Sequence, residues 1–321
     1  MLCPHCRLQG RRHGVNRNGS VRYRCGNCLR TYTDEVTRPV DRRCLAPEKA
    51  ILCLRMLLEG NSVRSVERLT GVHRDTILVT MVEAGENCRR FLERTLVALA
   101  VTDVECDECW GFVKTKEKNR ERNNLPETQG DAYCFTAIER SSKLIIAWHV
   151  GKRTSENTKL FAEKLRHATN GRFQLSADGY KPYQTAIPHA FGDDIDFATL
   201  VKVYGEPEEE RRYSPPTVVE VIKAAKIGNP DMDKVCTSII ERSNLTLRMG
   251  IRRLTRLTNA HSKKLENHEA AIALYIAYYD FVKVHGTIKR TPAAQAGLTD
   301  HTWSLQELLT KAAERTEVTA S

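Results

Sequence analysis

The chain has 321 residues, of which 41% are hydrophobic and 28% are charged, the composition of a globular protein large enough for more than one domain. It contains no apolar run of membrane-spanning length, and its first residues, MLCPHCRLQG, lack the apolar segment of a signal peptide. We therefore expect an intracellular protein with no membrane partner. Eleven cysteines without a secretory signal argue against a disulfide framework and favour metal binding.

Positive charge is concentrated in two segments. The formal net charge is +10, and residues 1–100 contribute +8 of it, with 18 Lys and Arg against 10 Asp and Glu. The second segment, residues 242–264, contains several basic side chains and no acid. Two separated basic segments suggest a polyanion held at two places, and nucleic acid is the obvious candidate. Two solvated charged faces are the alternative.

The first basic segment contains two Cys-x-x-Cys pairs separated by eighteen residues. This layout is typical of a zinc ribbon, in which four thiolates bind one ion. Asn18-Gly19, between the pairs, predicts a hairpin turn. So short a segment cannot bury a core, so we expect one structural Zn²⁺ to supply its folding energy; four free thiols in a flexible arm are the alternative. The predicted ligands are Cys3, Cys6, Cys25 and Cys28.

Helical periodicity begins after a polar linker. APEKAILCLRMLLEG places Ile51, Leu54, Leu57 and Leu58 on one face. Two further helical stretches follow, with Gly71 at the turn between them, and three helices in this arrangement predict a helix-turn-helix. Any three-helix bundle would show the same periodicity. The recognition helix would begin near His73 and present four side chains to base edges: His73, Arg74, Asp75 and Thr76.

Beyond residue 96 the hydrophobic period changes to that of strands alternating with helices. DAYCFTAIERSSKLIIAWHVGKRT predicts two strands turning at Ser141-Ser142, and SENTKLFAEKLRHATN predicts an amphipathic helix. RFQLSADGYKPY predicts a short strand ending at Asp178, and DFATLVKVYG predicts another strand. A strand hairpin followed by alternating helices and strands indicates a mixed α/β sheet.

The stretch VECDECWGFV offers two kinds of metal ligand. In an extended strand Cys106 and Cys109 point to opposite faces, so they cannot share one zinc ion without a knuckle turn. We therefore interpret both as core residues. Asp107 shares a face with Cys109 and Gly111, and the small Gly111 is expected to leave room beside its carboxylate.

Two further acids stand where sites usually form. Asp178 ends a strand and precedes a glycine, at the edge where α/β sheets gather their sites. Glu241 lies in a helical stretch, with Asn244, Arg248 and Arg252 expected to continue along its face. Three carboxylates suit two-metal phosphoryl transfer with Mg²⁺, which prefers hard oxygen ligands. Helix caps, surface charges or salt bridges are the alternative for each acid.

The complete set of motifs resembles the transposases of the insertion-sequence-1 family. CPHC with YRCGNC, the helix-turn-helix, DECWGFV, ADGYKPY and IERSNLTLR occur in that family's order, and YYDFVKVHGTIKRTPAAQAGL resembles the closing segment of many DDE transposases. The resemblance implies an RNase H-like fold whose catalytic triad is Asp107, Asp178 and Glu241, with Asn244 and Arg248 in the polar and basic positions after the glutamate. This chain departs from the family in the 62 residues between its second and third acids and in Ser243, where many members have histidine.

The resemblance also implies a mechanism and a set of partners. Water would cleave the 3′ ends of an insertion sequence, and the freed 3′ hydroxyl would then attack target DNA, with two Mg²⁺ (or Mn²⁺) ions bound by the three acids. The ribbon and the helix-turn-helix would recognise terminal inverted repeats of double-stranded DNA. A homodimer or larger assembly would hold the two ends, and the setting would be a prokaryotic cytoplasm near the nucleoid. A catalytically inactive DNA-binding regulator and an RNase H-like nuclease are the alternatives.

These interpretations divide the chain into four parts. We expect a zinc ribbon at 1–36, a helix-turn-helix domain at 45–95, an RNase H-like catalytic domain at 96–290 with an insertion around 192–235, and a C-terminal tail at 291–321. The apolar helix expected at 263–284 would pack against its own domain or against a partner. The side chains expected to contact DNA are Arg22, Arg24, His73, Arg74, Thr76, Asn244, Arg248, Arg252, Arg253 and Arg256.

Overall fold

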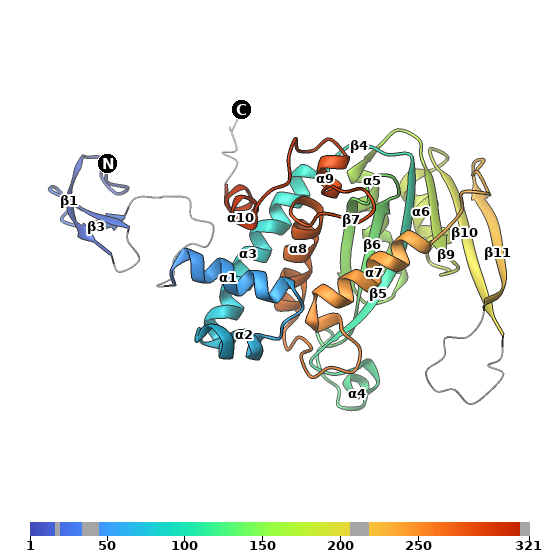
Figure 1. Ribbon diagram of the computed structural model, residues 1–321, viewed down its shortest axis with the longest axis horizontal. Coiled ribbons are helices and arrows are strands. Elements are labelled where there is room, and N and C mark those ends of the chain that lie inside the picture. The colour runs from blue at the N-terminus through green and yellow to red at the C-terminus, as the bar shows by residue number, and fades with distance from the viewer. Residues whose placement is uncertain (17–19, 34–44, 206–217, 315–321) are drawn as a thin grey trace.

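The computed structural model describes residues 1–16, 20–33, 45–205 and 218–314. Within these residues the chain has a mixed α/β fold built around a six-stranded sheet, with a small three-stranded sheet at the N-terminus and helices between the two (Figure 1). The predicted fold class, an RNase H-like mixed sheet preceded by a ribbon and a helical segment, is confirmed.

The N-terminal sheet is antiparallel, in the order β1-β2-β3, and its strands are Gly10–Val15, Val21–Cys25 and Thr31–Thr33. The rings of Tyr23 and Tyr32 stack with their centroids 5.9 Å apart. Gly10 lies under Tyr32, where a Cβ atom would come within 1.9 Å of the tyrosine hydroxyl, so a larger residue there would have to displace that ring. The hairpin turn predicted at Asn18-Gly19 lies outside the described residues.

Three helices follow: α1 (Pro47–Leu58), α2 (Val63–Thr70) and α3 (Arg74–Thr95). Ser62 caps α2 by accepting the backbone N–H of Ser65, and Gly71 ends that helix in the left-handed conformation, at φ 69°, which glycine adopts without steric cost. His73 caps α3 through its ring nitrogen, so the helix begins where the sequence predicted it. A small core of Cys53, Val66, Val72 and Ile77 holds the three helices together.

The main sheet has the strand order β11-β10-β9-β5-β6-β7. Strand β6 runs antiparallel to its neighbours β5 and β7, the strands β5, β9 and β10 are parallel, and β11 returns antiparallel to β10. The predicted turn at Ser141-Ser142 and the predicted strand end at Asp178 are both confirmed. The strands are Asp103–Val113 (β5), Gly130–Glu139 (β6), Ile145–Gly151 (β7), Gln174–Asp178 (β9), Asp196–Tyr204 (β10) and Val218–Ile227 (β11).

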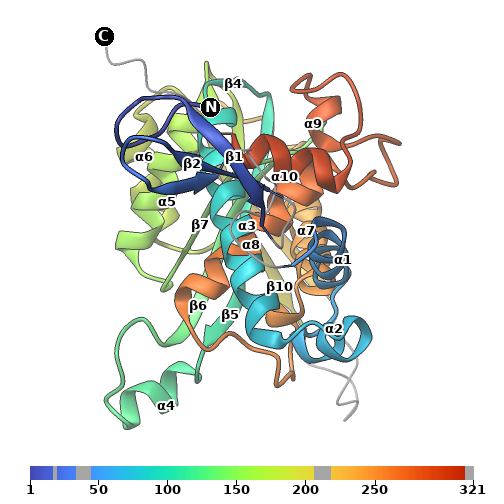
Figure 2. The same ribbon diagram turned by 90° about the vertical axis from the view of Figure 1, so that its left-hand side faces the viewer.

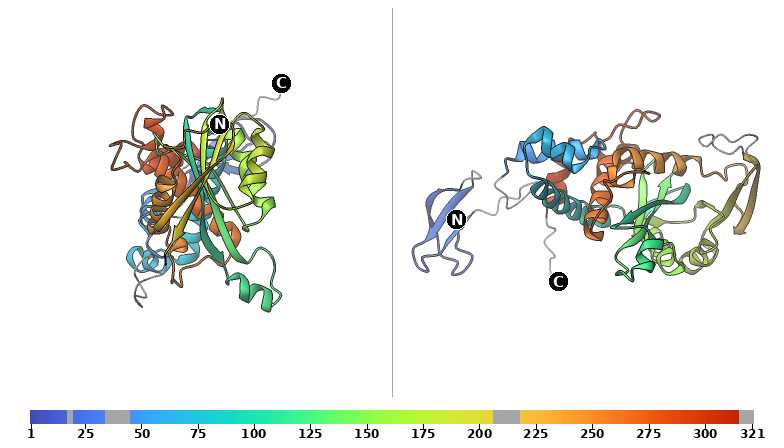
Figure 3. Two further views of the ribbon diagram at one scale, coloured as in Figure 1. Left: turned by 90° about the vertical axis from the view of Figure 1, so that its right-hand side faces the viewer. Right: turned by 90° about the horizontal axis from the view of Figure 1, so that it is seen from below.

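Helices cover both faces of this sheet. On one face lie α5 (Ser155–Ala168) and α6 (Tyr183–Phe191), and on the other lie α7 (Ser238–Gly250) and α8 (Leu265–Phe281), as Figures 2 and 3 show. Between its neighbours α8 is buried almost all round, and it packs most closely on α3 at Gly85, where a Cβ atom would lie 2.2 Å from the carbonyl oxygen of Ala270. The predicted apolar helix therefore packs within its own chain.

The remaining elements are short. Helix α4 (Glu117–Arg122) lies in the connection between β5 and β6, a 3-10 turn η1 (Arg252–Leu254) follows α7, and β4 (Leu99–Ala100) pairs with β8 (Thr169–Asn170). After α8 come α9 (Pro292–Gln295) and α10 (Leu305–Ala313), and Trp303 packs its ring against Phe91 and Phe281. Among the described residues, no helix combines the length and the apolar character needed to cross a lipid bilayer.

Candidate active site and metal centres

Strand β5 distributes its polar side chains between the two faces of the sheet. On the face of α7, Glu105 accepts the backbone N–H groups of Ile239 and Ile240, at 2.8 and 2.9 Å, and Asp107 accepts the side-chain amide of Asn244 at 2.8 Å. Glu105 thus caps the first turn of α7 and fixes that helix against β5. The site is consequently built where the start of α7 meets the middle of β5.

The cysteines of β5 are core residues, as predicted. Cys106 and Cys109 are both fully buried, Cys106 beside Tyr183 of α6 and Cys109 on the opposite face, within the field of Arg248 of α7. Burial raises the pKa of Cys109 to about 11, so the thiol stays protonated and is a poor metal ligand. The prediction that the two thiols point in opposite directions is confirmed.

Gly111 serves packing, because the space above its Cα atom is filled by side chains from elsewhere in the chain. A Cβ atom at Gly111 would lie 2.9 Å from the side chain of Leu254 and 3.2 Å from the ring of His268. Both side chains come from the segment that follows α7, which presses directly on β5. The small residue is needed because the chain after α7 approaches the strand closely.

Asp107 and Asp178 are brought together by the register of the sheet. Strand β9 pairs with β5 as far as Cys106 opposite Ala177 and then ends at Asp178, so the next residue on each strand carries a carboxylate. Ligand oxygens of Asp107, Asp178 and Glu108 all lie within 4.8 Å of one another. No local motif in the sequence marks Glu108, whose place in the cluster depends on where β9 ends.

Arg153 holds one side of this cluster. Its guanidinium donates to Glu108 at 3.0 Å and lies 3.7 Å from an oxygen of Asp178. The same guanidinium stacks over the ring of Tyr180, 4.0 Å from its centroid, which fixes its position. Asp178 also accepts the backbone N–H of Tyr180 at 2.9 Å, so its orientation is determined by the turn that follows β9.

Glu241 faces the same cavity from the first turn of α7. A cavity of about 840 Å³ is lined by Asp107, Asp178 and Glu241, together with Arg153 and Lys202. The carboxylate of Glu241 is bound by the ammonium group of Lys202 at 2.5 Å and by the hydroxyl of Thr237 at 2.8 Å. The structure therefore places the three predicted acids around one cavity, with Asp107 and Asp178 in direct proximity and Glu241 paired to a lysine of β10.

The electrostatics of the cluster favour a bound cation. Burial, with the charges of Asp178 and Glu241 adding to it, raises the pKa of Asp107 to about 6, although the N–H of Glu108 and the amide of Asn244 act in the opposite direction. Burial likewise raises the pKa of Glu108 to about 7. Crowded carboxylates of this kind repel each other when ionised, and hard oxygen donors facing one cavity are the ligands that Mg²⁺ prefers.

The residues after Glu241 are placed differently from the expected basic stripe. Helix α7 ends at Gly250, so Arg252 lies on the 3-10 turn η1 and does not continue the face of Asn244 and Arg248. Arg253 points inward, where it donates to Ser262 and to the sulfur of Met81. Arg252 and Arg256 are exposed. Ser243, two residues after Glu241, is buried.

The four N-terminal cysteines form a second cluster. The sulfur atoms of Cys3 and Cys28 are 3.6 Å apart, those of Cys6 and Cys25 are 3.3 Å apart, and all four lie within 4.8 Å of one another. Four thiolates around one Zn²⁺ at about 2.3 Å would have sulfur atoms about 3.8 Å apart, so the cluster fits that ion. Backbone N–H groups of Cys28 and Asn27 lower the pKa of Cys25 to about 6, which favours the thiolate that a metal needs.

The predicted DNA-contacting side chains near the N-terminus are accessible. Arg22 and Arg24 are both exposed on one face of β2. His73 and Arg74 are exposed at the start of α3, and Thr76 is half-buried beside them. The ring of His73 is used in capping the helix, which leaves Arg74 as the freest of the three.

Comparison with known proteins bears on the segment that carries the third acid. Residues 225–282 match the model of a family described as IS1 transposase. The predicted resemblance to insertion-sequence-1 transposases is confirmed by this match. It spans all of α7 and α8, from the last residues of β11 to the residue after Phe281, and it supports a transposase function.

A solved structure, the cryo-EM structure of a piggyBac transposase synaptic complex with hairpin DNA, resembles this chain with 9% sequence identity and a TM-score of 0.38, over 84% of this chain and 71% of that one. No curated protein matches the sequence.

Proposed function

We propose that the chain is a DDE-type transposase, a polynucleotidyl transferase that binds the terminal inverted repeats of an insertion sequence, cleaves their 3′ ends and joins them to target DNA. The observation that carries this proposal is that Asp107, Asp178 and Glu241, far apart in sequence, line one cavity together with three basic side chains. The transposase match over the segment that contains Glu241 supports the same assignment.

Asp107, Asp178 and Glu241 would hold two Mg²⁺ or Mn²⁺ ions. When bound, such ions activate the attacking oxygen and stabilise the leaving one in an in-line displacement at phosphorus. The donor set fits, because three carboxylates offer hard oxygen ligands around a cavity large enough for a phosphodiester. Glu108, which lies within the same 4.8 Å cluster, would assist either as a ligand or by holding Arg153 in place.

The surrounding side chains position these acids. The amide of Asn244 fixes one oxygen of Asp107, while Arg153 and the N–H of Tyr180 fix Asp178. Lys202 of β10 forms an ion pair with Glu241 of α7 and neutralises its charge. Arg153 and Lys202 would also attract the negatively charged backbone of DNA, because both line the cavity.

The remaining parts of the chain would recognise DNA and hold it. We propose a zinc ribbon at 1–36 with one structural Zn²⁺, a helix-turn-helix domain at 45–95 that reads bases through the start of α3, a catalytic domain at 96–290 with its insertion at 192–235, and a tail at 291–321. Two ends must be held at once, so we propose a dimer or larger assembly on DNA, working in a prokaryotic cytoplasm at the nucleoid.

The test is Mg²⁺-dependent cleavage and strand transfer on DNA fragments taken from the flanks of the gene. Wild type should cut them, and Glu241→Ala and Asp178→Ala should bind the same fragments but not cut them, because each loses a metal ligand and no DNA contact. Glu163→Ala, which removes an exposed acid from α5 on the opposite face of the sheet, is the matched control and should cut like wild type.

Three outcomes would contradict the proposal in different ways. Binding without cleavage by wild type, in Mg²⁺ and in Mn²⁺, would identify a DNA-binding regulator. Cleavage of RNA–DNA hybrids with no preference for the flanking fragments would identify an RNase H-like nuclease. Equal loss of binding and cleavage in Asp178→Ala would remove that residue from the proposed metal site.

A further inference from the structure

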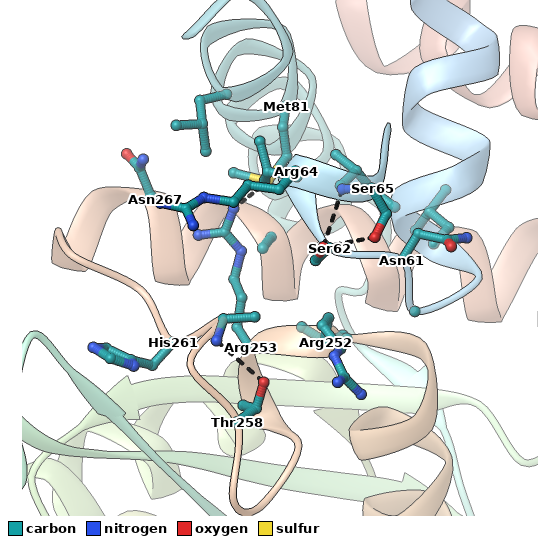
Figure 4. A pocket seen from close by; sticks show the side chains of 18 of the residues that line it. Asn61, Ser62, Arg64, Ser65, Met81, Arg252, Arg253, Thr258, His261 and Asn267 are labelled. Carbon is teal, nitrogen blue, oxygen red and sulfur yellow. Dashed lines mark hydrogen bonds between the residues drawn. The ribbon is translucent and has the colours of Figure 1, made fainter. Parts of the chain in front are cut away.

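A second and larger cavity lies between the three-helix segment and the chain that follows α7. It encloses about 1040 Å³ and is lined by the connection from α1 to α2, the start of α3, the loop around η1 and the inner face of α8 (Figure 4). We call it the basic cleft, because five cationic side chains and no Asp or Glu occur among its described lining residues. The five are Arg64, Arg74, Arg252, Arg253 and Lys263.

Arg253 is the most unusual of these side chains. It reaches across the cleft from the loop after α7 to Met81 of α3, as Figure 4 shows. Its guanidinium donates to the hydroxyl of Ser262 at 3.2 Å and to the thioether of Met81 at 3.2 Å, and a thioether is a weak acceptor. Within the described part of the chain, no carboxylate pairs with it. The residue as a whole is half-buried, and desolvation of the guanidinium alone lowers its pKa to about 10.

A buried cation without a counter-charge is costly in a folded protein. An arginine pays for desolvation, and an apolar side chain of similar size at such a position is often neutral or stabilising. The other four cations of the cleft also form no ion pair among the described residues, and Lys263 instead contacts His261. The cleft therefore holds positive charge around a guanidinium that no carboxylate of the described residues neutralises.

The first turn of α2 adds to this field. Ser62 and Ser65, which form the capping contact at the start of α2, both line the cleft (Figure 4). The N-terminus of a helix carries a partial positive charge and free N–H groups, which favour an anion. Hydroxyl groups, N–H groups and guanidinium groups together are the donors that recognise phosphate.

The position of the cleft fits one particular source of phosphate. Arg74 begins α3, the proposed recognition helix, and lines the cleft. At the other end, Gly250 lines the cleft while Glu241 lines the acidic cavity, and both belong to α7. Nine helical residues rise about 14 Å, which is about four nucleotides of a B-form strand at 3.4 Å each. A single strand of DNA can therefore reach from the cleft to the carboxylates.

We propose that the basic cleft seats the sugar-phosphate backbone of the bound DNA, between the bases contacted by α3 and the phosphodiester held by the three acids. The inference rests on the proposed function, because it names the path of the DNA through that same protein. It assigns phosphate contacts to Arg64 and Lys263, which are not among the side chains expected from the sequence to contact DNA, and it makes Arg253 the charge at the base of the seat.

The test measures how the full chain binds a short mixed-sequence DNA duplex over a range of salt concentrations, without added Mg²⁺. Each phosphate contact that is lost should reduce the slope of log K against log[salt] by about 0.9. Arg64→Gln combined with Lys263→Gln should therefore reduce the slope by about 1.8. Lys159→Gln combined with Arg166→Gln removes two charges from α5, on the other face of the sheet, and should leave the slope unchanged.

Arg253→Met supplies a readout that a structural role would not produce. If the guanidinium is there for DNA, the variant should bind DNA more weakly and yet melt at the same or a higher temperature than wild type when DNA is absent. A variant that melts lower and binds with an unchanged slope would show that Arg253 only supports the fold, and the seat would lose its central charge. If Arg253→Met does not fold, the salt slope of the variant that combines Arg64→Gln with Lys263→Gln still tests the proposal.

The remaining outcomes separate the cleft from the proposed function. If wild type cuts its flanking fragments but the cleft variant has the same salt slope as the α5 control, the proposed role of the cleft is wrong. The proposed transposase function would then still stand. Pyrophosphate that stabilises wild type but not the cleft variant, again with equal slopes on DNA, would identify a free phosphate ligand and overturn the DNA assignment. A reduced slope in the cleft variant alone supports the seat even if wild type never cuts.

Discussion

His268 provides a quantitative test of how α8 is packed. The residue is fully buried, its ring nitrogen Nδ1 lies 3.0 Å from the hydroxyl of Ser262, and its ring faces Gly111 of β5. Burial, with the charge of Arg253 adding to it, lowers the pKa of His268 to about 4. The folded protein therefore keeps this imidazole neutral at pH values where an exposed histidine is charged.

The sign and size of the effect on stability follow from that pKa. Above pH 6.5 the side chain is neutral in both states and contributes no pH dependence. Between pH 6.5 and about 4 the unfolded chain takes up a proton that the folded chain cannot, so the free energy of unfolding falls with falling pH. A difference of about 2.5 pKa units corresponds to about 3 kcal/mol.

The assay is urea denaturation of wild type and His268→Gln at about pH 7.5 and about pH 4.5, where the difference should reach about 2.7 kcal/mol. Wild type should lose more stability than the variant on acidification by about that amount, because glutamine does not titrate. His189→Gln, at an exposed position of α6, should follow wild type. If the two His268 curves stay parallel, the imidazole titrates normally and the close packing of α8 on β5 is refuted.

Three other changes test the remaining contacts. Gly85→Ala should lower the free energy of unfolding by about 2 kcal/mol, measured by urea denaturation, although glycine to alanine in an open helix stabilises by about 1 kcal/mol; the new Cβ would meet the backbone of Ala270. Arg74→Ala should weaken binding to the flanking fragments more than to random DNA in a competition assay, because the side chain is exposed at the start of α3. Native mass measurement should find one zinc in wild type and none in Cys25→Ser, since three thiolates leave the tetrahedron open.

Local periodicity was enough to predict most elements of the fold. The strand pair turning at Ser141-Ser142, helix α5 and the strand end at Asp178 all follow from patterns within a few residues. The end of α7 could not be predicted in this way. That helix stops at Gly250, where a Cβ atom would lie 2.0 Å from the ring of Tyr275, so the need for glycine at this position comes from α8, which is distant in the sequence.

The site was predicted in outline, and its missing members share one property. Asp107, Asp178 and Glu241 could be selected because each stands in a recognisable local motif. Glu108 and Lys202 could not, since both act through distant partners: Glu108 joins the cluster where β9 ends, and Lys202 meets Glu241 across the sheet. Contacts made by strand register depend on residues too far apart for any local pattern to encode.

The segment after α7 connects the two cavities physically. Leu254 and His268 press on Gly111 of β5, two positions from Cys109 and four from Asp107, while Arg253 extends from the same loop into the basic cleft. Burial lowers the pKa of His268 most, and the charge of Arg253 adds to that effect, so an anion near Arg253 would offset the added part and the pKa of His268 should rise when the cleft is filled. With DNA in the cleft, the free energy of unfolding should therefore fall less steeply with decreasing pH than DNA binding with an unchanged His268 pKa would produce. A histidine that never touches DNA would in this way report on its presence.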